Sequence, residues 1–244
     1  MKKLLLIIIL IMAIFQMVAI SANLFVDDFE SGNLTAWTSE TDSGGYLNIG
    51  TEAVALHGTY GMSVEIPNTT GRYVAKTLAS NQTRLRSRCY INTNSIAITN
   101  NTEVNFMYHY NAVGNIFTCL RNEGGVYKIR LITNDDSTQV YTSSYAISNG
   151  VHCVEVDWKA SSGDGNNDGF IELLIDGTSK ETVSNIDSDT RTTRYIRFGA
   201  VSQIAAGTSG TIYLDDYVCN NTGDVIGVIA ETPTGNAIMF GINF

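Results

Sequence analysis

Beyond residue 22, no stretch of the sequence repeats its apolar side chains with the period of about 3.6 residues that marks an amphipathic helix. Short runs instead alternate between apolar and polar residues, and clusters of Gly, Asn, Asp and Ser separate them. This pattern predicts an all-β protein, because successive side chains of a strand point to opposite faces of its sheet. The predicted strands are Leu47–Ile49, Gly61–Ile66, Arg72–Leu78, Leu85–Ile91, Glu103–Tyr110, Ile116–Arg121, Tyr127–Thr133, Val151–Trp158, Gly169–Ile175, Arg194–Ala200 and Gly210–Val218.

The predicted strand Leu85–Ile91 has two unlike faces. Arg86, Arg88 and Tyr90 lie on one face, and Leu85, Cys89 and Ile91 lie on the other. Such a strand is typical of an antiparallel sheet with one face in the core and one in water. The sequence therefore predicts a two-sheet antiparallel sandwich whose wet face is available to a ligand.

The N-terminus has the layout of a secretory signal. Lys2 and Lys3 precede an apolar run, and small residues follow near Ser21 and Ala22. We expect residues 1–22 to be a signal peptide, 23–219 a β-sandwich domain, and 220–244 a C-terminal extension with one or two strands. After cleavage no stable membrane span is expected, so the protein is predicted to be secreted or to lie at the cell surface; a retained membrane anchor is the alternative.

The chain is acidic. Loss of Lys2 and Lys3 with the signal would leave two fewer than the 15 basic residues of the full chain, against 24 acidic ones. Such a surface repels phosphate backbones, so nucleic acid is not expected as a partner. Neutral glycans and divalent cations remain compatible with this charge.

Four cysteines, at positions 89, 119, 153 and 219, allow two disulfides in an oxidising compartment, with three possible pairings. The alternative is that they are buried thiols. None of the spacings is CxxC, which disfavours a zinc cluster. Five Asn-x-Ser/Thr triplets are consistent with a polar outer surface.

Three parts of the chain resemble known jelly-roll strands. Asp27–Trp37 and His57–Val64 resemble the opening strands of secreted carbohydrate-binding jelly rolls, and Tyr213–Val218 resembles their closing strand. The middle, Val154–Gly177, resembles the concanavalin A-like (laminin G-like) sandwich. The resemblance spans Phe25–Val218 and implies a jelly-roll architecture. It implies no single activity, because such folds carry lectins, glycanases, lyases and structural modules.

The same resemblance implies a structural Ca²⁺ where the opening strand meets the closing one. The matching carboxylates are Asp28, Glu30 and Asp216, and carbonyls near His57 and Gly58 would complete the six to eight oxygens that Ca²⁺ prefers. The alternative is that these acids are exposed residues at the strand ends. Such a cation would stabilise the fold and take no part in catalysis.

A second candidate calcium loop is the run that begins at Asp164. Asp164, Asn166 and Asp168 supply oxygens at alternate positions, as in the first half of an EF-hand loop. Ile175 occupies the position at which an EF-hand loop has a bidentate glutamate, so we favour the interpretation that this segment is a polar hairpin tip.

Sugar binding by stacking is the predicted function, with a glycan or polysaccharide as partner. Aromatic rings present flat apolar faces, and nearby polar side chains can satisfy hydroxyl groups. Core packing is the alternative for each aromatic residue. The candidate residues are Tyr108, Tyr110, Tyr127 and Trp158, with Arg86 and Arg88 as polar partners.

A polysaccharide lyase or glycoside hydrolase is one alternative. Glu155 and Asp157 match part of the E-x-D-x-x-E motif of laminarinase-type enzymes, but the second glutamate is missing, and the signature strands of alginate lyases are absent. We assign no catalytic residue. The other alternative is a self-assembling surface or filament subunit, in which residues 231–244 would donate a strand to a neighbouring copy.

Overall fold

The computed structural model describes residues 23–51, 56–93 and 95–230. These residues form two antiparallel β-sheets with no helix among them, which confirms the predicted jelly-roll sandwich. The described part of the chain therefore contains no helix that is long and apolar enough to cross a membrane. The predicted signal peptide (1–22) and the predicted donor strand (231–244) lie outside the described residues.

One sheet has nine strands among the described residues, and its main path runs β15-β14-β13-β6-β17-β4-β3. The first and last strands of the sandwich meet in this sheet, because β1 pairs with β17 in the register Phe25 to Cys219. The strands are β1 (Phe25–Asp27), β3 (Leu47–Gly50), β4 (Gly61–Glu65), β6 (Arg84–Asn92), β7 (Ile96–Ala97), β13 (Val151–Lys159), β14 (Gly169–Ile175), β15 (Thr178–Ile186) and β17 (Ser209–Asn220).

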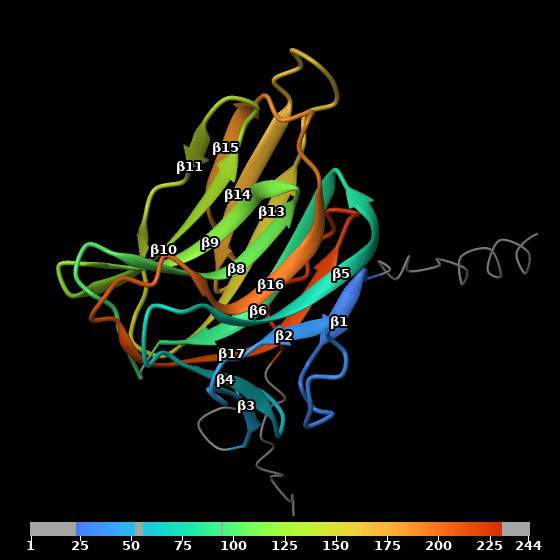
Figure 1. The fold of residues 1–244 in the computed structure, drawn as a ribbon. Helices are drawn as coiled ribbons and strands as arrows, with labels where there is room; N and C mark the ends of the chain where they lie inside the picture. Colours follow the sequence, from blue (N-terminus) through green and yellow to red (C-terminus); the bar gives the residue numbers. More distant parts are fainter. Residues whose placement is uncertain (1–22, 52–55, 94, 231–244) are drawn as a thin grey trace, which may run out of the picture.

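The other sheet has eight strands within the same described ranges, with the path β11-β10-β9-β8-β16-β5-β2. Figure 1 shows β10, β9, β8, β16 and β5 side by side in one layer of the sandwich. The strands are β2 (Ser39–Thr41), β5 (Arg72–Gln82), β8 (Glu103–Asn111), β9 (Val113–Glu123), β10 (Val126–Asn134), β11 (Gln139–Tyr141), β12 (Tyr145–Ala146) and β16 (Thr193–Ser202).

Every predicted strand is present, but the sequence did not reveal several short or marginal ones. The longest of these is β15, at the edge of the nine-stranded sheet. Its residues are mostly polar and exposed, so it lacks the apolar alternation by which a strand is recognised. Such polarity suits an edge strand, because polar side chains disfavour pairing of its free main-chain groups with another molecule.

A β-bulge interrupts the alternation of β8. Asn105 pairs with Cys119 and Met107 pairs with Thr118, so two residues of β8 oppose one of β9. Both Phe106 and Met107 are consequently buried. After the bulge, the side chains of β8 alternate between the two faces in the opposite phase, so Tyr108 points away from the core.

The core contains an aromatic cluster where the chain ends meet. Trp37 stacks on Phe198, with ring centroids 6.0 Å apart and planes 11° apart, and makes an edge contact of 5.5 Å with Tyr217. Its indole N–H donates to Asp27 Oδ2 at 2.6 Å. Burial raises the pKa of Asp27. The cluster joins side chains from both sheets, so it ties the opening strand to the rest of the core.

A hydrogen bond joins the two sheets through the core. His109 Nε2 of β8 lies 2.9 Å from the Tyr217 hydroxyl of β17, and both side chains are fully buried. Burial lowers the pKa of His109 to about 3, so the imidazole stays neutral in the folded protein. Unfolded histidine binds a proton below about pH 6.5, so the stability that His109 contributes falls as the pH drops below that value.

We predict that Tyr217→Phe destabilises the protein by about 1–3 kcal/mol, because it leaves the buried His109 nitrogen without its partner. The measurement is urea unfolding at neutral pH. The matched control is Tyr213→Phe, four residues earlier in β17 and partly exposed, which should change stability by less than about 0.5 kcal/mol. Equal effects of the two variants would contradict a role for the cross-sheet bond.

Candidate functional site

The outer face of the eight-stranded sheet carries a cluster of aromatic side chains around one arginine. We call this cluster the tyrosine face. Its members come from the adjacent strands β9, β8, β16 and β5, and all are partly exposed. The residues are Phe117, Tyr108, Tyr110, Tyr195, Arg197 and Tyr73.

The rings of the tyrosine face lie nearly parallel. Tyr108 stacks on Phe117 at a centroid distance of 4.6 Å and a plane angle of 16°, and on Tyr110 at 4.9 Å and 13°. Tyr195 continues the row at 5.2 Å from Tyr110. Strand pairing sets this order, because Tyr108 is opposite Phe117 and Tyr110 is opposite Tyr195. The result is a patch of aligned rings on a rigid sheet.

Arg197 lies at the centre of this patch. Its guanidinium carbon is 4.7 Å from the ring centroids of both Tyr73 and Tyr110, and 6.0 Å from that of Tyr108. Cation–π contacts of this kind hold a guanidinium in place without neutralising it. Among the described residues Arg197 forms no ion pair, so it stays an uncompensated positive charge in an acidic chain.

Charged and polar groups border the rings. Arg130 contacts Glu103 at 2.7 Å and lies over the Tyr141 ring at 5.2 Å. A hollow of about 130 Å³ there is lined by Glu103, Phe117, Arg130 and Tyr141, among others, and a larger one of about 600 Å³ adjoins it beside Glu103 and Arg121. Hydrogen-bond donors and acceptors thus lie next to the stacked rings.

Of the six predicted ligand-binding residues, the structure brings only Tyr108 and Tyr110 together on an exposed face. Tyr127 packs against the core, and its hydroxyl donates to the Ile96 carbonyl at 2.6 Å. Trp158 is fully buried, so the prediction that it stacks on a sugar is wrong. It shares the inner face of β13 with Val154 and Val156, where the core takes up its whole side chain.

Sequence reasoning missed four members of the tyrosine face: Tyr73, Phe117, Tyr195 and Arg197. The signal was present in β16, where Tyr195 and Arg197 alternate with the buried Ile196. The alternation places Tyr195 and Arg197 on the outer face of β16. It does not indicate that β5, β8 and β16 are neighbours, so it does not predict that their side chains form one cluster.

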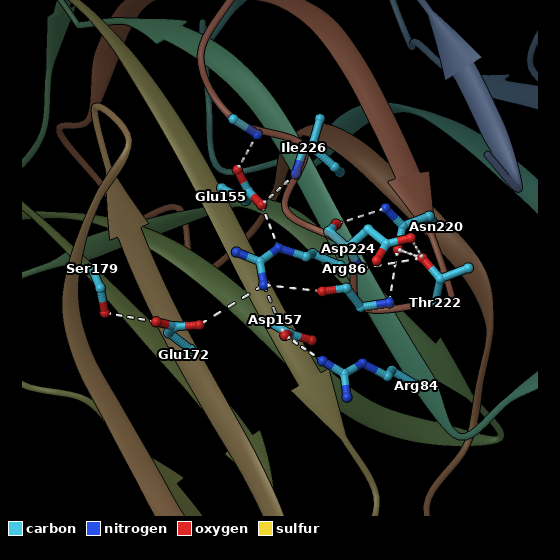
Figure 2. Close-up of polar contacts among 12 residues, drawn as sticks. Arg84, Arg86, Glu155, Asp157, Glu172, Ser179, Asn220, Thr222, Asp224 and Ile226 are labelled. Carbon is cyan, nitrogen blue, oxygen red and sulfur yellow. Dashed lines mark hydrogen bonds and ion pairs between the residues drawn. The ribbon is translucent and has the colours of Figure 1, made fainter. Parts of the chain in front are cut away.

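The outer face of the nine-stranded sheet is also polar, but its charged side chains are largely buried, and those of Arg84, Arg86, Glu155 and Asp157 are paired with one another. Arg86 binds Glu155 through Nε and Asp157 through Nη1, the latter at 3.0 Å, and Arg84 binds Asp157 at 2.7 Å (Figure 2). The Arg86 side chain is only 5% exposed. The prediction that Arg86 binds a sugar is therefore wrong, because its donors are used within the protein.

Arg88 is buried beside this cluster, with its guanidinium 5.2 Å from the Tyr90 ring centroid. It is likewise unavailable to a polysaccharide at the surface. Burial raises the pKa of Asp157, which the two neighbouring arginines oppose. Glu155 and Asp157 thus form part of a closed ion cluster, and these two carboxyl groups are not an open pair of the kind that glycosidic cleavage needs.

Residues 221–230, which we call the strap, cover this cluster. The main-chain N–H groups of Ile226 and Gly227 donate to the two carboxylate oxygens of Glu155, at 3.0 and 2.8 Å, and Ile229 N–H donates to the Tyr90 hydroxyl at 2.6 Å (Figure 2 shows the Ile226 contact). The strap forms no β-strand. Its docking therefore depends on side chains of the sheet rather than on strand pairing.

Gly223 permits the closest approach of the strap to the sheet. Its φ is +81°, and a Cβ at this position would lie 2.2 Å from the Arg84 guanidinium. Its carbonyl accepts a hydrogen bond from Arg86 at 3.4 Å. A side chain here would both strain the backbone and displace the arginine.

The four cysteines are free and buried, so the prediction of a disulfide is wrong for this structure. Cys89 and Cys153 lie on adjacent strands, but Cys89 is opposite Val154 and Cys153 is opposite Tyr90. Their side chains therefore point to opposite faces of the sheet. Burial raises the pKa of Cys153 to about 11 and that of Cys219 to about 12, so both remain thiols at neutral pH.

Two of the first predicted calcium ligands, Asp28 and Asp216, lie near each other where β1 and β17 pair. Asp216 is largely buried, and its Oδ2 lies 2.9 Å from His57 Nδ1. The charges of His57 and Arg88 favour the ionised form of this carboxylate. Burial and the negative charge of Asp28 raise the pKa of Asp216. Glu30 is engaged differently, since its Oε1 accepts the Thr59 and Tyr60 N–H groups at 2.7 and 2.8 Å.

The second predicted calcium loop is a turn between β13 and β14. Asp168 accepts the Ser162 N–H at 2.7 Å and pairs with Lys159 at 3.1 Å, and these contacts lower its pKa. Asn166 donates to the Ser162 hydroxyl, and Asp164 is exposed. The side chains of Asn166 and Asp168 stabilise the turn, in agreement with the interpretation of this segment as a polar hairpin tip.

Comparison with known proteins relates the chain to solved structures only. No protein-family profile matches it, and no curated protein matches its sequence. The "Cellulose induced protein, Cip1" is similar at a TM-score of 0.61 and 20% identity, over 84% of this chain and 100% of that one. The alginate lyase Aly36B gives 0.50 and 12%, over 70% and 82%. The "Botulinum neurotoxin serotype D ligand binding domain in complex with N-Acetylneuraminic acid" gives 0.52 and 15%, over 82% of this chain and 47% of that one. These similarities establish the jelly-roll fold.

We predict that Glu155→Gln destabilises the protein by about 3 kcal/mol, because it breaks a buried ion pair and weakens the acceptor of two main-chain bonds. Urea unfolding measures the loss, and amide exchange at Ile226 and Gly227 should accelerate. The matched control is Glu172→Gln: Glu172 is more exposed and lies 3.9 Å from Arg86, so it should cost less than about 1 kcal/mol. Unchanged exchange in the Glu155 variant would refute this account of how the strap docks.

Proposed function

We propose that this protein is a secreted carbohydrate-binding module whose tyrosine face holds the glycan without cleaving it. The observation that carries the proposal is the row of parallel rings from Phe117 through Tyr108 to Tyr110, with the unpaired Arg197 beside it. Because these rings stack on one another, the row offers apolar ring edges and phenolic hydroxyl groups to a sugar. Arginine offers several donors in a planar fork, which can bind hydroxyl or carboxylate oxygens.

The charge of Arg197 favours a glycan that contains carboxylate groups. An unpaired guanidinium held among tyrosines gains most from an anionic partner, because charge-assisted hydrogen bonds are about twice as strong as neutral ones. Glu103 and Arg130 next to the rings supply further acceptors and donors. Two of the similar structures have names consistent with this choice, since one contains N-acetylneuraminic acid and another is an alginate lyase.

The predicted result of Tyr108→Ala or Arg197→Ala is at least about 10-fold weaker glycan binding, or about 1.4 kcal/mol, as expected for aromatic and arginine anchors. The ligand is first found by screening the protein on a glycan array that includes uronate and sialylated glycans, and affinities are then measured by calorimetry. Tyr213→Ala, on the other sheet, should bind normally. An array without a single bound glycan would overturn the proposal.

The same samples separate this function from its alternatives. A polysaccharide lyase would release unsaturated uronates that absorb in the ultraviolet, and a hydrolase would release reducing ends, whereas a binding module changes neither. A filament subunit would form large species that disappear when residues 231–244 are removed. Any of these outcomes with no glycan bound would replace the binding function.

We also propose a structural Ca²⁺ held by Asp28 and Asp216, where the first and last strands pair. The two carboxylates supply oxygen ligands of the kind that Ca²⁺ prefers, and burial, with a smaller contribution from the charge of Asp28, raises the pKa of Asp216 although His57 Nδ1 lies 2.9 Å from its Oδ2. Glu30 fits less directly, because its Oε1 already binds two main-chain N–H groups. The cation would neutralise this charge and take no part in binding chemistry.

Calcium at 100 times its dissociation constant should stabilise the fold by about 2.7 kcal/mol, and so raise the melting temperature by about 5 °C or more relative to EDTA. Asp216→Asn should abolish the shift. Asp168→Asn should retain it, because Asp168 is already neutralised by Lys159. No shift in the unmodified protein would exclude the site, and loss of the shift in the Asp168 variant alone would move it to the β13–β14 turn.

A further inference from the structure

Ser148, His152 and Asp176 form a hydrogen-bonded chain at one end of the nine-stranded sheet, away from the tyrosine face. Ser148 Oγ lies 3.0 Å from His152 Nε2, and His152 Nδ1 lies 2.8 Å from Asp176 Oδ2. We propose that these residues are a nucleophilic triad that hydrolyses small acyl esters. The activity is separate from glycan binding, since it shares no residue with the tyrosine face.

The carboxylate is held in place by the backbone. Asp176 and Gly177 form the two-residue turn between β14 and β15, with φ values of +53° and +71°. Positive φ at both positions is typical of a type I′ hairpin, which favours Asp-Gly. Asp176 Oδ1 also accepts the Cys153 N–H at 2.9 Å. These contacts fix the orientation of the Asp176 carboxylate with Oδ2 toward His152, so Asp176 is a positioning residue.

That carboxylate determines the tautomer of His152. An ionised Asp176 can only accept, so the proton of the neutral imidazole resides on Nδ1 and Nε2 is left as an acceptor. Ser148 Oγ is the donor within reach of Nε2. This is the arrangement in which a histidine removes the proton from a serine nucleophile.

The Ser148 carbonyl favours the same proton transfer. It lies 3.1 Å from His152 Nε2, where it can accept only when that nitrogen carries a proton. The imidazolium that forms when Ser148 loses its proton thus gains a hydrogen bond that the neutral ring lacks. Among the described residues, His57 also contacts a carboxylate, that of Asp216, and His109 contacts Tyr217, but only His152 has a serine hydroxyl at its other ring nitrogen.

The nucleophile is accessible, whereas its base is shielded. Ser148 is exposed, and His152 is 8% exposed. The reaction also requires a donor for the oxyanion, and we assign this role to the main-chain N–H groups of Ser148 and Gly150. No deep acyl pocket adjoins Ser148 in the described residues; the nearest hollow that a triad member lines is reached through Asp176, beside Val151 and Val228. The surface therefore suits a small acyl group such as acetyl.

The reaction needs only water as co-reactant. Ser148 Oγ bonds to the ester carbonyl carbon while its proton passes to His152 Nε2. The bond from that carbon to the alcohol oxygen then breaks, and the alcohol leaves with the proton. Water attacks the acyl-serine, Nε2 takes its proton, and the carboxylic acid leaves as Ser148 Oγ is reprotonated.

The test uses the full protein with p-nitrophenyl acetate and a fluorophosphonate probe. We expect hydrolysis above the buffer rate, with a rate that rises with pH as a single base loses its proton, and covalent labelling that peptide mass spectrometry assigns to Ser148. Ser148→Ala should reduce the rate at least about 100-fold and abolish labelling. Asp176→Asn should lower the rate and alter its pH profile, because the wrong tautomer becomes possible.

Ser144→Ala is the matched control, a serine four residues earlier on the other side of β12, and it should retain full activity and labelling. Circular dichroism confirms that each variant is folded. The proposal is overturned if the folded wild-type protein is not labelled at Ser148, or if Ser148→Ala hydrolyses the ester at the wild-type rate. Either result leaves glycan binding untouched, and an array without binding leaves this activity untouched.

Discussion

In the central strands of this sandwich, alternate side chains pack into the layer between the two sheets, because that layer is where most of the apolar residues are buried. The outer faces are what remain for chemistry. Trp37, Phe198 and Tyr217 fill the inner layer where the chain ends meet. Which side chains are exposed is therefore decided by packing before any ligand is considered.

The two outer faces differ in how their charges are satisfied. On the nine-stranded sheet, Arg86 is surrounded by carboxylates and covered by the strap, so its charge is neutralised internally. On the eight-stranded sheet, Arg197 is held only by aromatic rings. Burying a charge without a partner costs free energy, whereas an exposed charge on a rigid sheet is solvated and can bind an oppositely charged ligand. This contrast is the reason why we propose that one face binds a ligand and the other contributes to stability.

Much of the fold could be predicted from the sequence, since period-two alternation locates the strands and turn residues separate them. The contacts of the site could not be predicted in the same way. The β8 bulge adds one residue and so turns Tyr108 outward, and no residue pattern marks it. Trp158 was misassigned although Val154 and Val156 on the same side of β13 already indicated its burial. Arg86 was misassigned because the strap docks through main-chain N–H groups, which carry no sequence signature.

The strap is held mainly by hydrogen bonds of its main chain, so its exposed side chains contribute little to its docking on the sheet. Val225 and Val228 are 66% and 51% exposed, although the chain beneath them is fixed to Glu155 and Tyr90. Evolution could therefore vary these outward positions widely while the strap stays docked. A laboratory could use the same freedom, attaching a dye or a short epitope at Val225 without touching the sheet below.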